Sequence, residues 1–321
     1  EVLNMNIVVL DADTHNPGDL SWDGIGKYGN LVLYDRTPEE KIVERAKDAH
    51  IVFTNKTPLT RETLLQLKNT KYVGVLATGY NVVDVKAAKE CGIVVTNVPD
   101  YGTQAVAQHV FALLLEITSH VGHHNAEVKK GRWSANTDFS FWDFPLMELS
   151  GKTFGVLGYG RIGKATARIA HAFGMKVLAY DRGREGLDGF VEKVSLDELY
   201  RRCDILSLHV PLSDETREMI NEESISKMKT GVILINTSRG PLINEKDLAN
   251  ALNAKKIGYA ALDVVSKEPI QADHILLGIA NCILTPHIAW APIEARRRLM
   301  TIVEENLAAY LDDKPLNQVN P

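Results

Sequence analysis

The sequence predicts an α/β protein built from two doubly wound parallel-sheet domains. Short apolar runs alternate with helix-compatible segments along most of the chain, and one such alternation contains a glycine-rich turn. Alternation of this kind is typical of βαβ units, which form parallel sheets with helices on both faces. At 321 residues the chain is long enough for two domains of ordinary size.

Composition favours a globular protein, with 45% hydrophobic and 24% charged residues. The formal net charge of −5 gives no reason to expect binding to nucleic acid or to an anionic membrane. No apolar run reaches the length of a membrane span, and no signal-peptide pattern opens the sequence. The three cysteines are scattered without C-x-x-C spacing. We therefore expect neither a disulfide framework nor a zinc site, and we expect a cytoplasmic protein.

The glycine-rich turn lies between two apolar runs. Thr153–Leu157 precedes the sequence GYGRIG, a segment with helical apolar spacing follows, and the second apolar run ends at Asp181. The order strand, turn, helix, strand, acid is that of a dinucleotide-binding unit. Gly158 is expected to make the turn, Gly160 to admit a pyrophosphate, and Gly163 to bring the helix close to the strand. The alternative is an ordinary glycine turn, which the complete pattern disfavours.

The same unit predicts the cofactor. N–H groups at the start of the helix, where Arg161 and Ile162 stand, are expected to hold the pyrophosphate with the help of the helix dipole. Asp181, roughly 20 residues beyond the turn, is expected to accept hydrogen bonds from the ribose hydroxyls and to repel a 2′-phosphate. The sequence therefore favours NAD over NADP.

The first hundred residues predict a small flavodoxin-like domain. Its expected strands are residues 6–10, 31–34, 50–53, 72–76 and 93–96, and its expected helical segments are 37–47, 60–67 and 82–90. The loop at 76–81 leaves the C-terminal end of a strand, where open α/β sheets place ligands. Taken locally it is either a ligand loop or a plain turn. Lys56, after another strand, is more simply a solvated lysine.

Residues 104–119 predict a buried helix that links the domains, because they have no wide polar face. His120, His123 and His124 follow at a spacing that could bind a metal on a helix. We expect no acidic or thiol ligand to accompany them, so we favour exposed or interface histidines and predict no metal site. Residues 129–149 are expected to be irregular. Their aromatic side chains indicate either a dimer contact or a loop folded onto its own domain.

The remaining alternation predicts a Rossmann-type NAD-binding domain. Its expected strands are 153–157, 176–180, 205–209, 232–236, 259–263 and 282–284, and its expected helices include 195–202, 222–228 and 245–253. A last helix, 292–311, is expected to return to the first domain, with its three consecutive arginines (296–298) on a solvated face. Residues 1–101 and 292–321 are thus predicted to form the substrate domain, and 102–291 the NAD-binding domain.

Three ionisable residues lie just beyond strands of the predicted NAD-binding sheet: Arg239, Glu268 and His287. Each alone is most simply a surface charge, but strand ends meet at one edge of a parallel sheet, so the three can converge beside a nicotinamide. Reduction of a 2-keto acid needs a proton donor, a role that histidine fills near neutral pH. It also needs a cation for the substrate carboxylate, and arginine matches that group. Glu268 can hold the imidazole in one tautomer.

Over essentially its whole length the chain resembles the D-isomer-specific 2-hydroxyacid dehydrogenases. The resemblance is carried by LGYGRIGKATARIAHAFGMKVLAYD, by the run from HVPLSDE to DLANAL, by ALDVVSKEP and by TPHIAWAP. It implies catalytic roles for Arg239, Glu268 and His287. It also implies that Ala77, Thr78 and Gly79 bind the substrate carboxylate. The further substrate contacts that we expect are Arg239, His287 and Trp290.

The resemblance also implies cofactor contacts outside the glycine turn. Contacts on the nicotinamide side are expected from Thr103, Thr237 and Asp263. Contacts on the ribose or adenine side are expected around residues 209–211. The further cofactor-binding residues that we expect are His209, Val210, Pro211, Thr216, Ser238 and His287.

NVPDYGTQAVAQH and TPHIAWAP most resemble the glycerate dehydrogenase, or hydroxypyruvate reductase, branch. This implies NADH-dependent reduction of hydroxypyruvate, and of glyoxylate, to the D-hydroxy acid (D-glycerate), and the reverse oxidation, by a homodimer. The alternatives are a D-lactate or other D-2-hydroxyacid dehydrogenase and a non-enzymatic NADH-binding regulator resembling the C-terminal-binding-protein corepressors. Glu268 argues against the formate dehydrogenases, and the end at Pro321 leaves no room for the regulatory domain of many phosphoglycerate dehydrogenases.

Overall fold

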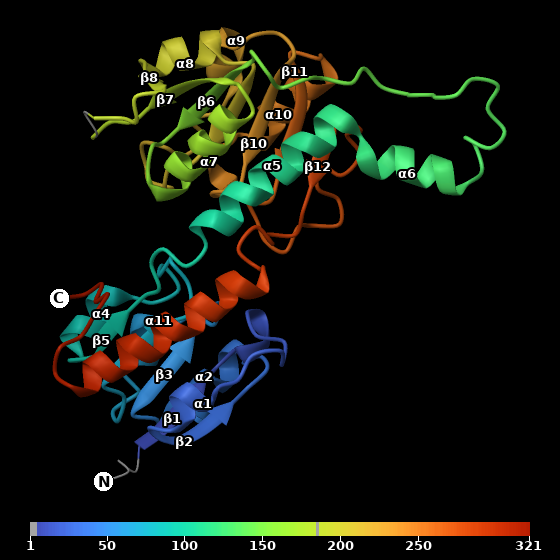
Figure 1. The fold of residues 1–321 in the computed structure, drawn as a ribbon. Coiled ribbons are helices and arrows are strands. Elements are labelled where there is room, and N and C mark those ends of the chain that lie inside the picture. The colour runs from blue at the N-terminus through green and yellow to red at the C-terminus, as the bar shows by residue number, and fades with distance from the viewer. Residues whose placement is uncertain (1–4, 184–185) are drawn as a thin grey trace. The chain divides into compact units, whose positions relative to one another are not determined.

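The computed structural model describes residues 5–183 and 186–321, and the chain divides into two compact units. The first unit runs to Gly102 and resumes at Ala291, and the second is Thr103–Trp290. Each unit is a parallel sheet with helices on both faces (Figure 1). The chain therefore passes from one unit to the other twice, and the predicted α/β fold with two doubly wound sheets is confirmed.

The first unit contains a five-stranded parallel sheet with the order β2-β1-β3-β4-β5, which is the flavodoxin-like order. Its strands are β1 (Met5–Val9), β2 (Gly29–Leu33), β3 (Ile51–Thr54), β4 (Tyr72–Val75) and β5 (Val94–Thr96). Its helices are α1 (Asp23–Gly26), α2 (Ile42–Ala46), α3 (Arg61–Leu64), α4 (Val85–Glu90) and α11 (Ile293–Leu311), with 3₁₀ turns at Ala12–Thr14 and Glu39–Lys41.

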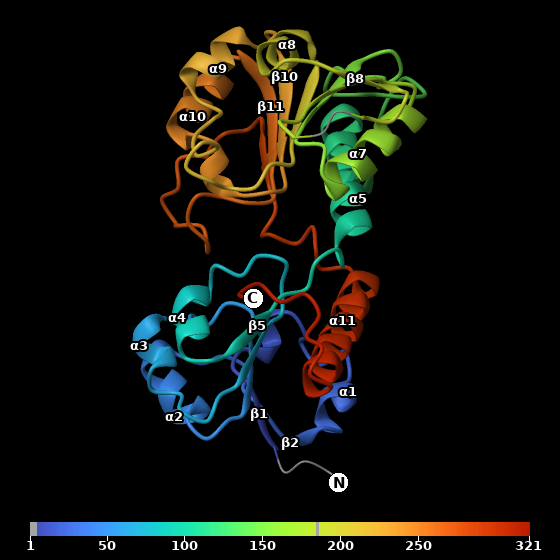
Figure 2. The ribbon, with the colours of Figure 1, turned by 90° about the vertical axis from the view of Figure 1, so that its left-hand side faces the viewer.

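Helices cover both faces of this sheet (Figure 2). On one face Val52 and Val73 of the strands pack with Ile42 of α2 and Leu64 of α3. On the other face α11 follows its expected return to this unit, and the ring of Tyr310 lies 4.7 Å from that of Tyr72. The apolar positions of each strand thus alternate between two buried faces, as a doubly covered sheet requires.

The arginine run at the start of α11 corrects one prediction. Arg297 and Arg298 are exposed as expected, but Arg296 is buried. Its guanidinium donates to both carboxylate oxygens of Asp19 at 2.7 Å, and its Nε donates to the carbonyl oxygen of Ala291 at 2.9 Å. Arg296 stands three and seven residues before the buried Leu299 and Val303, so it belongs to the apolar stripe of the helix rather than to its solvated face.

The second unit contains a seven-stranded parallel sheet with the order β12-β11-β10-β9-β6-β7-β8. Counted within the unit this is the Rossmann order with one further strand at the edge. Its strands are β6 (Thr153–Leu157), β7 (Lys176–Tyr180), β8 (Val191–Lys193), β9 (Ile205–Leu208), β10 (Val232–Asn236), β11 (Ile257–Leu262) and β12 (Cys282–Leu284). Its helices are α5 (Thr103–Ser119), α6 (Val121–Lys129), α7 (Arg161–Ala172), α8 (Leu196–Arg202), α9 (Glu222–Lys227) and α10 (Glu245–Asn253), with a 3₁₀ turn at Gly240–Leu242.

Two core clusters lie on opposite faces of this sheet. Leu234 of β10 packs towards α8, α9 and α10, whereas its neighbours Ile233 and Ile235 pack towards α5 and α7 (Figure 2). α5 is buried as predicted and lies against α7, with Phe111 stacked on Phe154 at 5.6 Å. The sequence did not predict β8, because this three-residue edge strand carries two charged residues and no apolar run.

Residues 130–152 contain no regular element, as predicted for most of this stretch. Figure 1 shows α6 and the segment that follows it reaching away from the sheet and helices of their own unit before the chain returns to β6. Residues 130–147 are called the arm below.

Candidate active site

The glycine turn after β6 contains contacts that only glycine allows. Gly158 has a φ of +98°, and a Cβ there would lie 2.8 Å from the carbonyl carbon of His209. A Cβ on Gly163 would lie 2.0 Å from the carbonyl oxygen of Gly158. The first turn of α7 therefore packs directly on the loop between strand and helix, as the sequence predicted for these two glycines.

The N-terminal end of α7 is open where Gly160 stands. Gly160 is the N-cap residue, and a Cβ there would meet no described atom within 4 Å. The first N–H groups of the helix, at Arg161 and Ile162, point out of this end together with the positive end of the helix dipole. A pyrophosphate fits this end, because nothing in the Gly160 position would obstruct it.

Asp181 directly follows β7 and is fixed against the same turn. Its carboxylate accepts hydrogen bonds from the N–H of Tyr159 at 2.9 Å and from the N–H of Gly183 at 3.0 Å. The acid that the sequence assigned to the ribose thus lies beside the glycine turn. This placement is consistent with a role in cofactor binding, which stays a prediction.

The loops after β9 and β10 are held by internal hydrogen bonds. His209 donates its N–H to the carbonyl of Leu157 at 2.7 Å, and burial lowers the pKa of its imidazole to about 3, so the ring is neutral. The Thr216 hydroxyl donates to the carbonyl of Pro211 at 2.7 Å. The Ser238 hydroxyl donates to the carbonyl of Leu208 in the same way, also at 2.7 Å. These hydroxyls therefore shape the loops, and cofactor contacts from Val210 and its neighbours stay predictions.

Thr237 is different, because its buried hydroxyl has no hydrogen-bond partner among the described residues. Buried hydroxyls are nearly always paired, so this one calls for a partner from outside the chain. Thr237 directly follows β10, the strand whose end also carries Arg239. The unpaired hydroxyl, the open helix end and the close-packed glycines together fit a dinucleotide cofactor.

Arg239 stands at the exposed tip of the turn after β10. The buried side chain of Asn236 shapes this turn: its amide donates to the carbonyl of Arg239 at 2.8 Å, and its oxygen accepts from the N–H of Ser238 at 3.0 Å. Arg239 Nη1 donates to the carbonyl of Ser238 at 2.7 Å. The backbone of the turn is thus fixed, and the exposed guanidinium can still turn its remaining N–H groups to an anion.

Glu268 and His287 form an ion-pairing contact. Nδ1 of His287 lies 2.6 Å from Oε2 of Glu268, and both side chains are only partly exposed. An ionised carboxylate can only accept, so Nδ1 carries a hydrogen and Nε2 is the nitrogen that gains or loses the exchangeable proton. The loops that carry Glu268 and His287, which the sequence analysis identified separately, are therefore in contact.

His287 also has an unusual backbone. Its φ is +55°, a left-handed conformation that is uncommon for residues with a side chain. The conformation is held by Trp290, whose Nε1 donates to the carbonyl oxygen of His287 at 2.6 Å. Strain of this kind is found mostly at functional sites.

Buried Asp263, the residue after β11, anchors the segment that carries His287. Its carboxylate accepts the Thr285 hydroxyl at 2.6 Å and the N–H groups of Ile288 and Ala289, each at 2.9 Å. Nε2 of His109, on α5, lies 3.4 Å from the same carboxylate. Burial by itself raises the pKa of Asp263, but these hydrogen bonds outweigh it and keep that pKa below its usual value.

Comparison with known proteins agrees with this geometry. The family model described as "D-isomer specific 2-hydroxyacid dehydrogenase, NAD binding domain" matches residues 111–289. A hydroxypyruvate reductase of Blautia hydrogenotrophica is 54% identical over 98% of this chain and 100% of its own length. The chain belongs to the D-isomer specific 2-hydroxyacid dehydrogenase family. The family prediction is confirmed, and with it the dehydrogenase class and a nicotinamide cofactor.

Two further known proteins are similar to this chain. A glycerate dehydrogenase of Methylorubrum extorquens is 41% identical, covering 88% of this chain and 89% of that one. The solved structure of an acyclic imino acid reductase, in complex with NADPH and D-Arg, has a TM-score of 0.87 and 33% identity, covering 98% and 100% of the two chains. The same fold thus occurs in a reductase whose structure contains NADPH and D-Arg.

In the first unit of this dehydrogenase, the loop after β4 has its carbonyl and side-chain groups engaged. The carbonyl of Ala77 accepts the N–H of Val98 at 3.0 Å, and the Thr78 hydroxyl donates to the carbonyl of Val98 at 2.9 Å. Within the described residues, no hydrogen bond is donated by the N–H groups of Ala77, Thr78 or Gly79. These groups remain available for the carboxylate that the resemblance assigns to this loop.

A buried aspartate organises the neighbouring loop of the first unit. The carboxylate of Asp11, just after β1, accepts the N–H groups of Asn55, Lys56 and Thr57 at 2.6–2.9 Å, and the Thr57 hydroxyl at 3.0 Å. The Lys56 side chain is exposed. Asp11 carried no motif, so nothing in the sequence singled it out.

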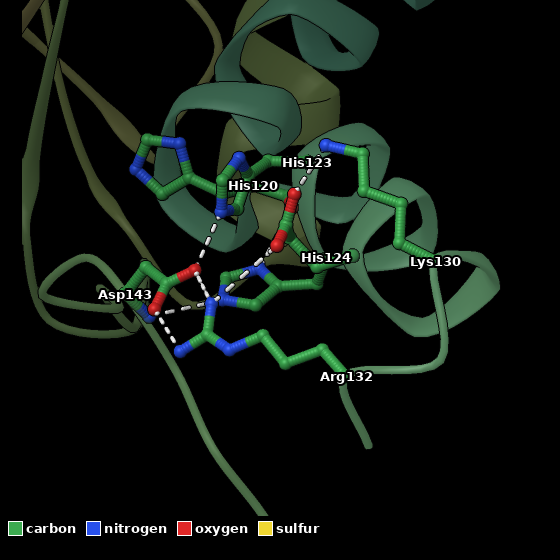
Figure 3. Close-up of polar contacts among 7 residues, drawn as sticks. His120, His123, His124, Lys130, Arg132 and Asp143 are labelled. Atoms are coloured by element: carbon green, nitrogen blue, oxygen red, sulfur yellow. Dashed lines mark hydrogen bonds and ion pairs between the residues drawn. The ribbon is translucent and has the colours of Figure 1, made fainter. Parts of the chain in front are cut away.

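The three histidines do not share one helix. His120 has a φ of +47° and lies between α5 and α6, so only His123 and His124 stand in the first turn of α6. Figure 3 shows Asp143 of the arm folded back onto them, with Nε2 of His123 2.6 Å from the Asp143 carboxylate. The sequence did not indicate Asp143 as the partner of His123, because 20 residues separate the two. The described residues contain no group of three or more histidine, cysteine, aspartate or glutamate side chains arranged to hold a metal ion.

The sequence also missed His109 and Glu245. His109 lies on α5, more than 150 residues before its partner Asp263, and Glu245 is one of several acids at the start of helices. Neither has a local pattern that separates it from a surface residue.

Among the helices of the described residues, none has both the length and the apolarity that crossing a bilayer requires.

Asp263→Asn is expected to lower the free energy of unfolding by about 1–3 kcal/mol at pH 7, because an amide cannot accept all of these bonds. The pKa of Asp263 is lower in the folded than in the unfolded chain, so its stabilisation is complete above the unfolded value near about 3.9 and is lost as the pH falls through the folded value. Urea unfolding measures the free energy of unfolding of the wild type and of Asp263→Asn. The difference between the two proteins should therefore be smaller near pH 3 than at pH 7. Asp273→Asn, on the exposed surface, is the control, and an unchanged difference would contradict the assignment.

Proposed function

We propose that the chain reduces hydroxypyruvate, and glyoxylate, to the D-hydroxy acid with NADH, and catalyses the reverse oxidation. The observation that carries the proposal is the 2.6 Å contact between His287 and Glu268 in the same parallel-sheet unit as Arg239 and the glycine turn. Support for the substrate comes from the relatives named hydroxypyruvate reductase, glycerate dehydrogenase and glyoxylate reductase. A D-lactate dehydrogenase is the alternative within the family.

Each residue has a distinct part in this proposal. Arg239 binds the substrate carboxylate through its planar guanidinium and polarises the adjacent carbonyl. The N–H groups of Ala77, Thr78 and Gly79 bind the same carboxylate. His287 holds a proton on Nε2 and donates it to the carbonyl oxygen as that oxygen becomes a hydroxyl.

Glu268 keeps His287 in the tautomer and orientation that this transfer needs, and it stabilises the imidazolium before the proton leaves. Trp290 keeps the backbone of His287 in its left-handed conformation and borders the substrate. In the reverse direction the neutral Nε2 of His287 removes the hydroxyl proton. Reduction therefore uses the protonated imidazole and oxidation the neutral one.

The cofactor is proposed to occupy the open end of α7. Gly158, Gly160 and Gly163, with Arg161 and Ile162, hold the pyrophosphate, and Asp181 binds the adenosine ribose. When bound, NADH supplies the hydride that the reduction requires. Thr237 pairs its buried hydroxyl with the nicotinamide side. The residues that complete the proposed cofactor site are Thr103, His209, Val210, Pro211, Thr216, Ser238, Asp263 and His287.

We further propose that the protein is a homodimer and that the arm is its contact. Large apolar side chains are exposed along the arm: Trp133 (53%), Phe139 (90%), Trp142 (65%), Leu146 (56%) and Met147 (38%). The two sides of the arm are linked, since Arg132 donates two hydrogen bonds to Asp143, at 2.5 and 2.6 Å (Figure 3). An exposed apolar surface of this kind favours a protein interface.

The three free thiols fit the expected cytoplasmic location.

Substrate and proton donor are tested together by the loss of NADH absorbance. Hydroxypyruvate is expected to give the highest kcat/KM among hydroxypyruvate, glyoxylate, pyruvate and phosphohydroxypyruvate. His287→Ala should lower kcat by roughly 10²–10⁴-fold, because the proton donor is lost, while NADH still binds in a fluorescence titration. His171→Ala, on an exposed helix position, is the control. No turnover of any keto acid by the wild type would favour the non-enzymatic regulator.

Cofactor choice is tested at Asp181. Asp181→Ala should raise the ratio of kcat/KM for NADPH to that for NADH by about tenfold, a change of roughly 1.4 kcal/mol, because the charge that repels a 2′-phosphate is removed. Asp197→Ala, on the exposed part of α8, serves as the matched control. A ratio equal to that of the wild type would remove the ribose contact from the proposal.

The dimer is tested by sedimentation velocity. The wild type should sediment as a dimer, and Phe139→Asp with Trp142→Asp should give monomers, because two charges would be buried in the contact. Leu65→Asp, at an exposed leucine of the first unit, should leave the dimer intact. A monomeric wild type, or a dimer that survives both arm substitutions, would refute the role of the arm.

A further inference from the structure

The loop that carries Glu268 has little apolar packing to hold it. Val264 (2% exposed) is the last buried residue after β11, and Leu276 (0% exposed) is the next one that joins the core. Between them residues 266–273 are all exposed. Burial therefore fixes the two ends of this loop but not the position of Glu268 within it.

Glu245, the first residue of α10, supplies the missing constraint. Its Oε1 accepts the N–H of Ser266 at 2.7 Å, and its Oε2 accepts the Ser266 hydroxyl at 2.5 Å. Both carboxylate oxygens are therefore bonded to the residue two positions before Glu268. The N-terminal end of a helix also favours an ionised carboxylate at this position.

The same carboxylate holds the other side of the loop. Nε2 of His274 lies 3.1 Å from Oε2 of Glu245, and Nδ1 of His274 accepts the N–H of Leu276 at 3.3 Å. Because Nδ1 is an acceptor, Nε2 carries the hydrogen and donates it to Glu245. The His274 side chain is only 8% exposed, so this hydrogen bond is shielded from water. Glu245 thus bonds to the loop on both sides of Glu268.

A second contact joins this loop to the turn of Arg239. A Cβ on Gly240 would lie 1.9 Å from the carbonyl carbon of Val265 and 2.4 Å from the nitrogen of Ser266. The backbones of the two loops therefore touch, and only a glycine fits between them. The N–H of Val265 in turn donates to Oε1 of Glu268 at 3.3 Å.

We propose that Glu245 is a positioning residue for the reaction: through Ser266 and His274 it holds the exposed loop so that Glu268 meets His287. The proposal rests on the function proposed above, since it gives Glu245 no contact with substrate or cofactor. α10 is anchored in the core by Leu248 and Leu252, so Glu245 transfers the rigidity of a buried helix to an exposed loop. Displacement of a catalytic group by about 1 Å can cost roughly 100-fold in rate.

A double-mutant cycle on kcat separates this role from a general loss of stability. Glu245→Ala should lower kcat for hydroxypyruvate about 10- to 100-fold while the Kd for NADH changes less than about twofold. In a Glu268→Gln background the same substitution should change kcat by less than about twofold, because Glu268 is no longer there to position. Equal fold-changes in both backgrounds would overturn the proposal.

The chain offers a matched control at Glu198. Its carboxylate accepts the N–H and the hydroxyl of Ser195 at 2.9 and 2.8 Å, the same pair of bonds as Glu245 makes to Ser266, but on α8 and away from the loop. Glu198→Ala should leave kcat within about twofold of the wild type. Ser266→Ala, which removes only a hydroxyl from an exposed position, should lower kcat in the same direction as Glu245→Ala but less.

Hydrogen exchange measured by mass spectrometry reads the loop without any catalysis. Peptides covering residues 264–277 should exchange at least about tenfold faster in Glu245→Ala than in the wild type or in Glu198→Ala. Unchanged exchange there would refute the positioning role even if kcat fell. If instead Glu268→Gln alone leaves kcat unchanged while exchange rises in Glu245→Ala, the loop restraint stands and the assigned role of Glu268 fails.

Discussion

All seven strands of the larger sheet are parallel, and this one constraint brings the loops of the candidate site to the same edge of the sheet. Every strand ends at the same edge, so the turns that follow β6, β10, β11 and β12 all leave the sheet there, although the chain separates them by up to about 130 residues. The edge brings these loops together but does not bury them. Arg239 is exposed, and Glu268 and His287 are only partly covered. Their positions therefore depend on hydrogen bonds rather than on packing.

Carboxylates just beyond strand ends supply those hydrogen bonds in both units. Asp11 accepts three N–H groups from the loop after β3, Asp263 accepts two from the segment after β12, and Asp181 accepts one from the glycine turn. In each case the acid follows one strand and the loop follows its direct neighbour in the sheet. Glu245, at the start of α10, likewise accepts hydrogen bonds from a loop, the one that carries Glu268. An ionised carboxylate suits this task because it accepts several N–H groups at once.

The arm and α11 show where local pattern and tertiary structure disagree. A run of three arginines is typical of a solvated face, yet Arg296 falls on the buried stripe of α11 and finds Asp19 there. His120 and His123 have a helical spacing, but the left-handed backbone at His120 breaks the helix between them. Asp143 then reaches His123 from the far side of the arm, and Arg132 and His123 hold its pKa well below the usual range. The contacts of Arg296, His123 and Arg132 each depend on a partner at least 11 residues away, which local spacing cannot indicate.

The sequence by itself determined the strands of both sheets except β8, the dinucleotide turn and the three residues of the proposed chemistry, because apolar periodicity and glycine spacing act over a few residues and repeat in a fixed order. Only the tertiary structure decided which charges are held and by what: Asp11 by three N–H groups, Asp263 by His109 and the segment of His287, and Glu245 by both sides of the Glu268 loop. Charged residues far apart in the chain look alike in sequence. The fold gives them different surroundings, because a carboxylate next to a strand end or a loop acquires hydrogen-bond partners that its neighbours in the chain do not provide.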